Sequence, residues 1–540
     1  MNPLKKLLPL ALLAVGALSL LVGCGGGTSG EDGGNDEYTE DGKLKISLRN
    51  LYFESWTGGD VYTEAVQDKF NVSLTPSTYS YNDWTSQVSA AVNANNLTDV
   101  FQFNVTQFNF ANSYKYWTEG EVLKALPDDL SPWPNLQSLI NNTSAIDSLM
   151  IDGHLYGLPI AKNVLKPKVD YSPFTYVYRQ DWAKSWGVYQ QDDVYTWDQF
   201  TNLVNVFNTH LNPTGNSDSY ALADVEWGFP SVTNFSKQVP HCFAFDSANN
   251  KYVGNFATDG YVAGMEIAKN YVSSKIYGYD QYTATEGGAR KAYCGNKCGI
   301  FYENLSLANY NDIREALATS NSNDKQFDVN GASAIMKVKG PDGKFALEGT
   351  DNWFSMTLFN HDISTKKMRK ILDIMDWLLG EEGTRLAVDG IEGYDYTLDG
   401  EGNIALTENG WPKDEETGKY IGKTNGAKYL RYMATLGNDY ASFDPMTDLT
   451  AYGVISAWES EMAAAANAST LRVVKEKEEV MWLSTELKDA YEGTLLKAAN
   501  DEVIRYCYGK DDKSKYLETV TTGQWPKVLS EVNRKLGYEQ

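Results

Sequence analysis

Residues 44–104 alternate between strand-like and helix-like patterns, and this alternation constrains the fold more than any other feature of the sequence. The predicted order is strand, helix, strand, helix, strand, over residues 44–53, 60–70, 71–75, 83–96 and 99–103. Such an order predicts a parallel sheet with right-handed crossovers, and therefore an α/β fold. Sheets of this kind bind ligands at the carboxyl ends of their strands.

The rest of the chain continues in this style and then becomes mostly helical. Further strands are predicted near residues 176–182, 297–302, 345–347 and 353–359, and further helices near residues 197–207 and 260–276. From Thr365 onward, helical patterns dominate. With 540 residues, the chain is long enough for two large domains or three small ones. We expect an α/β protein with a helical C-terminal part.

The charge balance is strongly acidic. The formal net charge is -24, because 71 Asp and Glu residues oppose 47 Lys and Arg residues. Recognition of nucleic-acid phosphates requires a basic footprint, so we expect no nucleic-acid partner. The excess of acidic residues is typical of a protein whose surface must remain soluble.

The chain begins with a segment that resembles a secretory signal. Lys5 and Lys6 precede an apolar stretch, residues 7–23, that is shorter than the about 20 residues of a membrane-spanning helix. Its end, LVGC at residues 21–24, resembles the lipobox of bacterial lipoproteins. The resemblance implies cleavage before Cys24, a diacylglycerol on its thiol and an acyl chain such as palmitate on its amino group. We expect a signal peptide at 1–23 and a lipidated flexible tether at 24–43; the alternative is an ordinary signal peptide near a free cysteine.

Four further cysteines follow, Cys242, Cys294, Cys298 and Cys507. Four cysteines allow three pairings, so the sequence does not decide their state. Either Cys294 and Cys298 close a small disulfide loop, or all four are buried thiols. Zinc is not expected, because the chain has only four histidines and none lies near a cysteine pair with ligand spacing.

Several short motifs follow one another along the chain: HLYGLPI at 154–160, YRQDW at 178–182, TWDQF at 196–200, NPTGNSD at 212–218, DWLLGEEGTR at 376–385, GIEGYDY at 390–396 and QWPK at 524–527. In this order they resemble the family 1 extracellular solute-binding proteins of ABC transporters (maltose-binding-protein-like). They are most similar to the long Gram-positive lipoproteins of oligosaccharide uptake. Single motifs are weak, but their order spans nearly all of the mature chain.

The resemblance implies two α/β lobes joined by hinge crossings, with a ligand cleft between them. We expect an N-terminal lobe from residues 44–160 plus 300–353, and a C-terminal lobe from residues 161–299 plus 354–540. The crossings are expected near residues 159–163, 298–303 and 353–359. A ligand that contacts both lobes stabilises the closed state, which the permease subunits recognise.

The implied function is that of the substrate-binding lipoprotein of an ABC importer, which captures an oligosaccharide and delivers it to the permease. We expect a monomer, lipid-anchored at the extracellular face of the cell membrane, without a cofactor. The alternatives are a surface glycan-binding protein without a transport role and a carbohydrate-active hydrolase. The sequence contains no H-E-x-x-H, G-x-S-x-G or Walker-type motif, so we expect no enzyme and no catalytic residue.

A sugar site needs carboxylates and amides for hydroxyl groups and aromatic rings for the apolar sugar faces. The candidates lie in loops after strands or near the crossings: Glu54, Trp56, Asp60, Asn104, Gln107, Glu226, Trp227, Glu303, Asn304, Trp353, Glu392 and Tyr394. For each, the alternative is a core ring or a solvated acid. Arg179 and Asp181 are expected to form a structural ion pair. No metal is expected, because the 212–218 loop has Asp218 as its only carboxylate.

Overall fold

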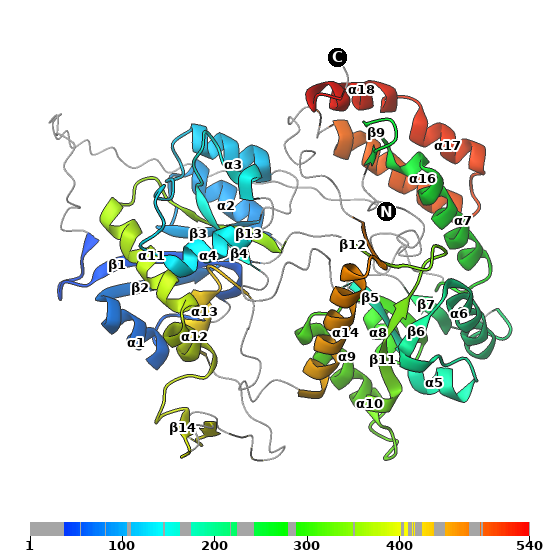
Figure 1. The fold of residues 1–540 in the computed structure, drawn as a ribbon, viewed down its shortest axis with the longest axis horizontal. Coiled ribbons are helices and arrows are strands. Elements are labelled where there is room, and N and C mark those ends of the chain that lie inside the picture. Colours follow the sequence, from blue (N-terminus) through cyan, green and yellow to red (C-terminus); the bar gives the residue numbers. More distant parts are fainter. Residues whose placement is uncertain are drawn as a thin grey trace, which may run out of the picture.

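Two five-stranded sheets organise the chain, which we describe from a computed structural model (Figure 1). The structure describes residues 37–53, 56–80, 83–104, 110–143, 146–161, 174–215, 218–223, 242–278, 288–348, 352–400, 404–408, 413, 415, 424–436, 449–474, 487 and 490–538. Among these residues, none of the helices has both the length and the apolar character needed to span a membrane.

The first sheet has the strand order β2-β1-β3-β13-β4. Its strands are β1 (Leu44–Asn50), β2 (Val72–Thr78), β3 (Val100–Asn104), β4 (Gly157–Ala161) and β13 (Trp353–Phe359). Strand β1 pairs in parallel with β2 and β3, whereas β13 is antiparallel to both β3 and β4. The helices α1 (Val61–Phe70) and α2 (Trp84–Asn93) follow β1 and β2. The predicted β-α-β-α-β order of this region is therefore confirmed.

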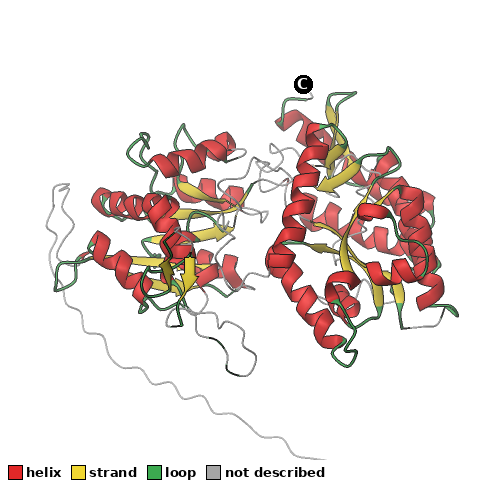
Figure 2. Cartoon of the chain, turned by 60° about the horizontal axis from the view of Figure 1, so that its bottom comes forward, coloured by secondary structure: helices red, strands yellow, loops and turns green. Residues whose placement is uncertain are grey.

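The second sheet has the strand order β6-β11-β5-β10-β7. Its strands are β5 (Phe174–Arg179), β6 (Val194–Tyr195), β7 (Tyr220–Ala223), β10 (Cys298–Asn304) and β11 (Ser333–Val338). Strand β5 is antiparallel to β10 and β11, while β7 and β6 run parallel to β10 and β11, respectively. Figure 2 shows helices around the strands of each sheet, as expected for an α/β fold.

The remaining helices and strands complete these two units. The helices are α3 (Phe110–Glu119), α4 (Pro134–Asn142), α5 (Gln180–Ser185), α6 (Trp197–Leu211), α7 (Asp259–Ser273), α8 (Gly288–Cys294), α9 (Leu307–Ser320), α10 (Val329–Ala332), α11 (Thr365–Leu379), α12 (Glu381–Val388), α13 (Gly426–Arg431), α14 (Leu449–Asn467), α16 (Lys497–Cys507), α17 (Lys513–Thr521) and α18 (Trp525–Lys535). Small two-stranded sheets pair β8 (Phe243–Asp246) with β9 (Lys251–Gly254), β12 (Phe345–Glu348) with β16 (Leu471–Val474), and β14 (Tyr396–Leu398) with β15 (Ile404–Leu406).

Each sheet has its own hydrophobic core. One core joins residues of β1–β4 to β13 and helices α11–α13, and we call this unit the first lobe. Two further clusters surround the second sheet and include residues of α14, α16, α17 and α18; we call this unit the second lobe. The two lobes lie side by side in Figure 1.

The sheets correct two of the predicted lobe segments. Strands β10 and β11 belong to the second sheet, so residues 300–338 do not lie in the first lobe. Strand β13 and helices α11–α13 belong to the first lobe rather than to the second. The reason is that a short apolar run has the same local pattern in either sheet, because strand pairing is a long-range contact.

The crossings between the sheets follow from this topology. The chain leaves the first sheet after Ala161, returns between Glu348 and Trp353, and leaves again after α13, before α14. The crossing predicted near residues 298–303 is wrong, because these residues form β10 within the second sheet.

The last part of the predicted tether is folded onto the first lobe. Tyr38 forms a β-bridge with Leu44, and the backbone N–H of Thr39 donates to the carbonyl of Lys43 at 2.9 Å. The carboxylate of Glu37 lies 3.9 Å from the Lys367 ammonium. These contacts correct the predicted tether for residues 37–43; residues 1–36, including Cys24, lie outside the described residues.

Two other predictions concern the second lobe. Cys242, Cys294, Cys298 and Cys507 are buried free thiols, which decides between the two alternatives left open by the sequence. The structural pair of Arg179 and Asp181 is confirmed, with Nε–Oδ1 and Nη2–Oδ2 distances of 2.8 and 2.5 Å. The guanidinium also lies 4.1 Å from the ring centre of Trp182.

Candidate ligand-binding site

The chain topology joins the carboxyl edge of one sheet to the carboxyl edge of the other. At the first crossing, the chain leaves β4 at its carboxyl end and enters β5 at Phe174, which pairs with Asn304 at the end of β10. At the return crossing, it enters β13 at Trp353, which pairs with Ala161 at the end of β4. Ligand sites of open α/β sheets lie at this edge, so the candidate site lies where the two edges meet the crossings.

A cluster of aromatic rings lies at the carboxyl end of β1, and we call it the first-lobe aromatic cluster: Tyr52, Phe53, Trp56, Tyr429 and Tyr432. Tyr429, from α13, stacks on Trp56 with ring centres 6.0 Å apart and an interplanar angle of 17°. Phe53 meets the same indole edge-on at 4.7 Å. Trp56 is only 3% exposed, whereas Tyr52, Tyr429 and Tyr432 are partly exposed. The outer rings therefore offer flat faces supported by a buried indole.

The carboxylate of Asp60 fixes this cluster to the start of α1. Its Oδ1 accepts hydrogen bonds from the backbone N–H groups of Tyr62, Thr63 and Gly426 at 3.1, 3.0 and 3.0 Å. Its Oδ2 accepts from the Trp56 indole at 3.1 Å and from the Thr63 hydroxyl at 2.6 Å. One side chain thus caps α1 and holds α13 beside it.

Gly426 is required by this close approach. A Cβ atom at this position would lie 1.9 Å from Thr63 Oγ1 and 2.6 Å from Trp56 Nε1. The described contacts of Trp56 and Asp60 are therefore internal to the first lobe. They do not test the predicted role of these two residues in ligand binding.

The loop before β14 presents Glu392 and Tyr394 near the start of α1. Both are exposed, Tyr394 to 43%. The loop is held by Asp395, fully buried, which accepts hydrogen bonds from the Tyr62 hydroxyl at 2.7 Å and from the Ile391 N–H at 2.6 Å. Burial raises the pKa of the Tyr62 hydroxyl, and the neighbouring Tyr394 and Asp60 raise it further. Tyr62 is therefore a neutral donor at physiological pH.

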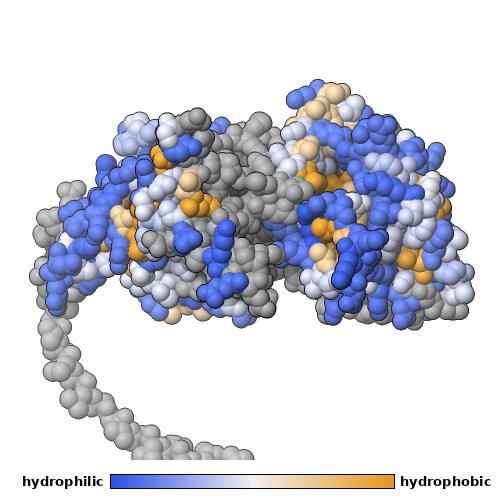
Figure 3. All heavy atoms as spheres, turned by 90° about the horizontal axis from the view of Figure 1, so that it is seen from below, coloured by the Kyte–Doolittle hydropathy of each residue, from blue (hydrophilic) through white to orange (hydrophobic). Residues whose placement is uncertain are grey.

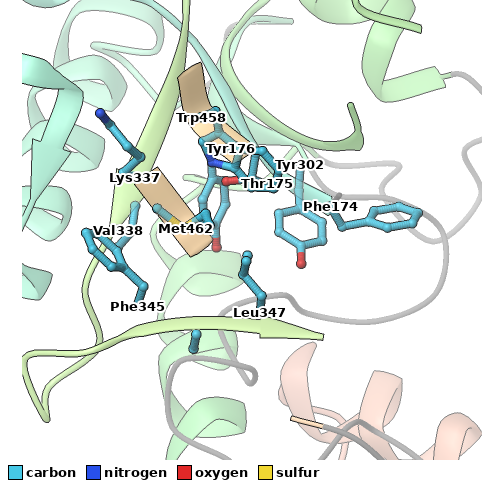
Figure 4. Close-up of a pocket in the computed structure, with 11 residues that line it drawn as sticks. Phe174, Thr175, Tyr176, Tyr302, Lys337, Val338, Phe345, Leu347, Trp458 and Met462 are labelled. Carbon is cyan, nitrogen blue, oxygen red and sulfur yellow. The ribbon is translucent and has the colours of Figure 1, made fainter. Parts of the chain in front are cut away.

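The second lobe has a cavity at its own carboxyl edge (Figure 4). Its volume is about 20 Å³, and it is lined by Phe174, Thr175, Tyr176, Tyr302, Lys337, Val338, Phe345, Ala346, Leu347, Trp458 and Met462. Phe174 stacks on Tyr302 with ring centres 5.8 Å apart, and Tyr176 meets Tyr302 edge-on at 5.1 Å. Both lobes therefore place aromatic side chains at the edge that the crossings join.

Two cations near this cavity, Arg290 and Lys337, are paired with carboxylates. Arg290 Nε lies 3.1 Å from an oxygen of Glu303, and its Nη1 lies 3.7 Å from Asp312. Lys337 Nζ lies 2.5 Å from an oxygen of Glu461. The predicted ligand residue Glu303 is thus an ion-pair partner at the end of β10. In the described part of this edge, the charges of Arg290 and Lys337 are therefore balanced by carboxylates.

The other predicted site residues fall in three groups. Trp353 is the first residue of β13, at the carboxyl edge of the first sheet, and is 2% exposed. Asn104 and Asn304 lie at the carboxyl ends of β3 and β10, but their side chains are not described. The predicted residues outside the described part are Glu54, Gln107, Glu226 and Trp227.

The structure thus brings some predicted residues together and separates others. Trp56, Asp60, Glu392 and Tyr394 gather around the start of α1, whereas Glu303 lies in the second lobe. The aromatic residues missed by the sequence prediction are Tyr52, Tyr429, Tyr432, Phe174, Tyr176, Tyr302 and Trp458. The residues near the ends of strands, such as Phe174, could have been found by their position in the predicted sheet. The residues contributed by α13 and α14 could not, because nothing in the sequence of these helices indicates that they lie beside the carboxyl edge of a sheet. In the described residues, no group of three metal-binding side chains occurs.

No protein family model matches the sequence, and no curated protein matches it. Solved structures do resemble this one over nearly its whole length. An extracellular solute-binding protein from Bifidobacterium longum subsp. infantis has a TM-score of 0.63 and 12% identity, covering 93% of this chain and 100% of its own. The chain has the fold of the extracellular solute-binding proteins.

Two more structures with the solute-binding fold are similar. One is an HMO-binding, ABC-transporter-associated solute-binding protein from Bifidobacterium longum infantis, with a TM-score of 0.62, 13% identity and coverage of 93% of this chain and 100% of that one. The other is an N-glycan transport solute-binding protein from Streptococcus pneumoniae, with a TM-score of 0.58, 13% identity and coverage of 92% and 98%. The predicted fold class of two α/β lobes is confirmed.

Proposed function

We propose that the protein is the substrate-binding lipoprotein of an ABC importer, which captures an oligosaccharide between its two lobes and delivers it to the permease. One observation carries this proposal. Each lobe places aromatic side chains at the carboxyl edge of its sheet, and the crossings join these two edges. Sugar rings present apolar C–H faces that stack on aromatic side chains. The names of the structurally similar proteins, which include an HMO-binding and an N-glycan transport protein, support a carbohydrate ligand.

The first lobe would contribute the partly exposed rings of the first-lobe aromatic cluster, with Trp56 and Asp60 behind them and Trp353 at the crossing. The loop residues Glu392 and Tyr394 would reach ligand hydroxyl groups from the start of α1. The second lobe would contribute Phe174, Tyr302 and Glu303. The proposal also retains the other predicted residues, because they follow strands or lie in loops. These residues are Glu54, Asn104, Gln107, Glu226, Trp227 and Asn304.

A neutral oligosaccharide fits this edge best. Arg290 and Lys337 each have a carboxylate partner, so an acidic sugar would have to compete with Glu303 or Glu461 for them. The net charge of -24 also repels an acidic ligand as it approaches. Figure 3 shows a mostly hydrophilic surface on the described part of the protein, with small scattered hydrophobic patches.

Isothermal titration calorimetry against a panel of neutral oligosaccharides tests the binding role. We expect at least one glycan to bind with a negative heat-capacity change, because rings bury apolar faces. If no glycan binds and a peptide does, the ligand class is wrong. Mass spectrometry of the same mixtures separates the alternatives, because shortened chains would indicate a hydrolase. Bound glycan that never enters cells when the permease is supplied would indicate a surface glycan-binding protein.

The proposed membrane attachment depends on Cys24. We propose that the mature protein begins there and is held at the extracellular face of the cell membrane by its acyl chains, since durable anchoring needs more than one chain. Growth with labelled palmitate, followed by extraction into detergent, measures this directly. We expect label in the wild-type protein and none in Cys24→Ala. Equal labelling of both would place the lipid elsewhere.

A further inference from the structure

The cavity of the second lobe differs from the aromatic surface of the first lobe in size and in chemistry. It lies between strands β5, β10, β11 and β12 and helix α14. In Figure 4, Val338, Phe345 and Met462 lie on one side, Tyr302 and Phe174 on the other, and Leu347 between them. It is a small recess in the wall of the proposed cleft.

The volume of the cavity, about 20 Å³, limits what can enter it. One water molecule needs about 10–15 Å³ on the same measure. A hexose ring is therefore too large, whereas a substituent of one or two heavy atoms fits. The cavity can hold the tip of a group carried by a sugar ring that itself lies outside.

The walls are mixed, so they suit a small group that has both an apolar tip and a hydrogen-bonding stem. Val338, Leu347 and Met462 contribute aliphatic or thioether surface, and Phe345 and Trp458 contribute rings. The Thr175 hydroxyl donates to the carbonyl of Met336 at 3.1 Å. Tyr176 and Tyr302 also line the cavity and carry hydroxyl groups, so the walls combine apolar surface with hydrogen-bonding groups. Lys337 is held by Glu461, so a carboxylate tip gains no new partner there.

We propose that this cavity is an acetamido subsite, which takes the acetyl methyl of an N-acetylhexosamine residue. The acetyl group has an apolar methyl of the right size, and its amide N–H and C=O stay at the mouth, near the phenol of Tyr302 and the ends of the strands. The ring of the same residue rests against the stacked pair Phe174–Tyr302. The inference rests on the proposed oligosaccharide-binding function and narrows its ligand class to N-acetylated glycans.

Matched sugar pairs that differ by acetamido against hydroxyl test the subsite. The pairs are chitotriose with cellotriose and N-acetyllactosamine with lactose, each titrated calorimetrically into the full-length protein. We expect the N-acetylated member to bind at least about tenfold more tightly, because one methylene in an apolar pocket changes affinity by about 10–200-fold. Equal binding of the two members, or binding only of glycans without acetamido groups, would overturn the subsite.

Two variants separate the cavity from the rest of the cleft. Leu347→Phe fills the cavity and should reduce the preference to about one while the affinity for the hydroxyl member stays within about threefold. Leu347→Val keeps the cavity open and should retain the preference. Met462→Phe serves as a second filling variant if Leu347→Phe does not fold, as judged by circular dichroism.

The outcomes distinguish this inference from the proposed function. Binding of neutral glycans without an acetamido preference overturns the subsite and leaves the importer role intact. A preference that persists in both filling variants also overturns it. Failure of every glycan to bind overturns both the subsite and the oligosaccharide-binding function.

Discussion

Replacing Asp60 with alanine tests whether one carboxylate holds the first-lobe aromatic cluster together. In the structure this side chain caps α1 through two backbone N–H groups and accepts the N–H of Gly426, at the start of α13. Loss of such a cap costs about 0.5–2 kcal/mol. The buried N–H of Gly426, left without an acceptor, costs about 1–3 kcal/mol more. The Trp56 indole keeps a second acceptor, Thr63 Oγ1 at 2.9 Å, so we assign it no separate cost.

These contributions predict that Asp60→Ala destabilises the first lobe by about 1.5–5 kcal/mol. The chain has two lobes, so one global unfolding curve would mix their transitions. Hydrogen–deuterium exchange resolves them, because each peptide reports the stability of its own region. Peptides covering α1 and α13 should exchange about 10-fold to 4,000-fold faster, since about 1.4 kcal/mol corresponds to a factor of ten. Peptides of α6, in the second lobe, should be unchanged.

Asp83 provides a matched control, because it is also an aspartate at the N-cap of a helix in the same lobe. Its side chain makes no capping hydrogen bond to α2. Asp83→Ala should therefore change exchange of its helix by less than about threefold, within the about 0.5 kcal/mol range of ordinary surface substitutions. If Asp60→Ala behaves like Asp83→Ala, the carboxylate does not hold α1 and α13 together and the reasoning is wrong.

Three more predictions follow from individual contacts. Gly426→Ala places a Cβ 1.9 Å from Thr63 Oγ1, so we expect overpacking to lower the stability of the first lobe by about 1–3 kcal/mol or more. Hydrogen–deuterium exchange of the α1 and α13 peptides measures this loss. Unchanged exchange would show that α13 can shift freely. Tyr62→Phe removes the hydroxyl that donates to Asp395, so the 390–396 loop should lose about 0.5–1.5 kcal/mol of local stability. The affinity for glycans should fall as a result, and titration calorimetry measures that affinity. Burial raises the pKa of Glu502, which is 5% exposed, so the folded state binds more protons than the unfolded one. Stability should therefore fall as the pH rises from about 4.5 through the raised pKa, and Glu502→Gln should flatten this part of the profile in thermal unfolding from pH 4 to 8; parallel profiles would contradict it.

The Tyr62→Phe variant has its own control. Tyr116 on α3 is 74% exposed, so Tyr116→Phe removes a hydroxyl without removing a buried hydrogen bond. It should leave the loop and glycan binding unchanged. If both variants weaken binding equally, the effect does not pass through Asp395.

Local patterns in the sequence determined the elements that depend on near neighbours. The alternating patterns of residues 44–104 predicted β1, α1, β2, α2 and β3. These elements are predictable because the spacing of apolar residues within a short segment distinguishes a helix from a strand. The capping box of Thr196 and Gln199 and the ion pair of Arg179 and Asp181 also join residues that are close along the chain.

Some local predictions were less accurate at their ends. The strand predicted for residues 176–182 begins at Phe174 and ends at Arg179, where α5 begins. The sequence pattern assigns the first residues of α5 to the strand, because Trp182 fits an apolar pattern of either period. The effect on the site is that Phe174, at the start of β5, was not recognised as a candidate.

Only the tertiary structure decided which sheet each late strand joins and which distant residues pack against Trp56 and Asp60. The apolar runs of β10 and β13 look alike locally, yet one pairs with β5 and the other with β3 and β4. Trp56 and Asp60 pack against α13 because Gly426, which is distant in the sequence, lies beside them. The physical reason is that periodicity records whether a side chain is buried, whereas the partner that buries it comes from a distant part of the chain.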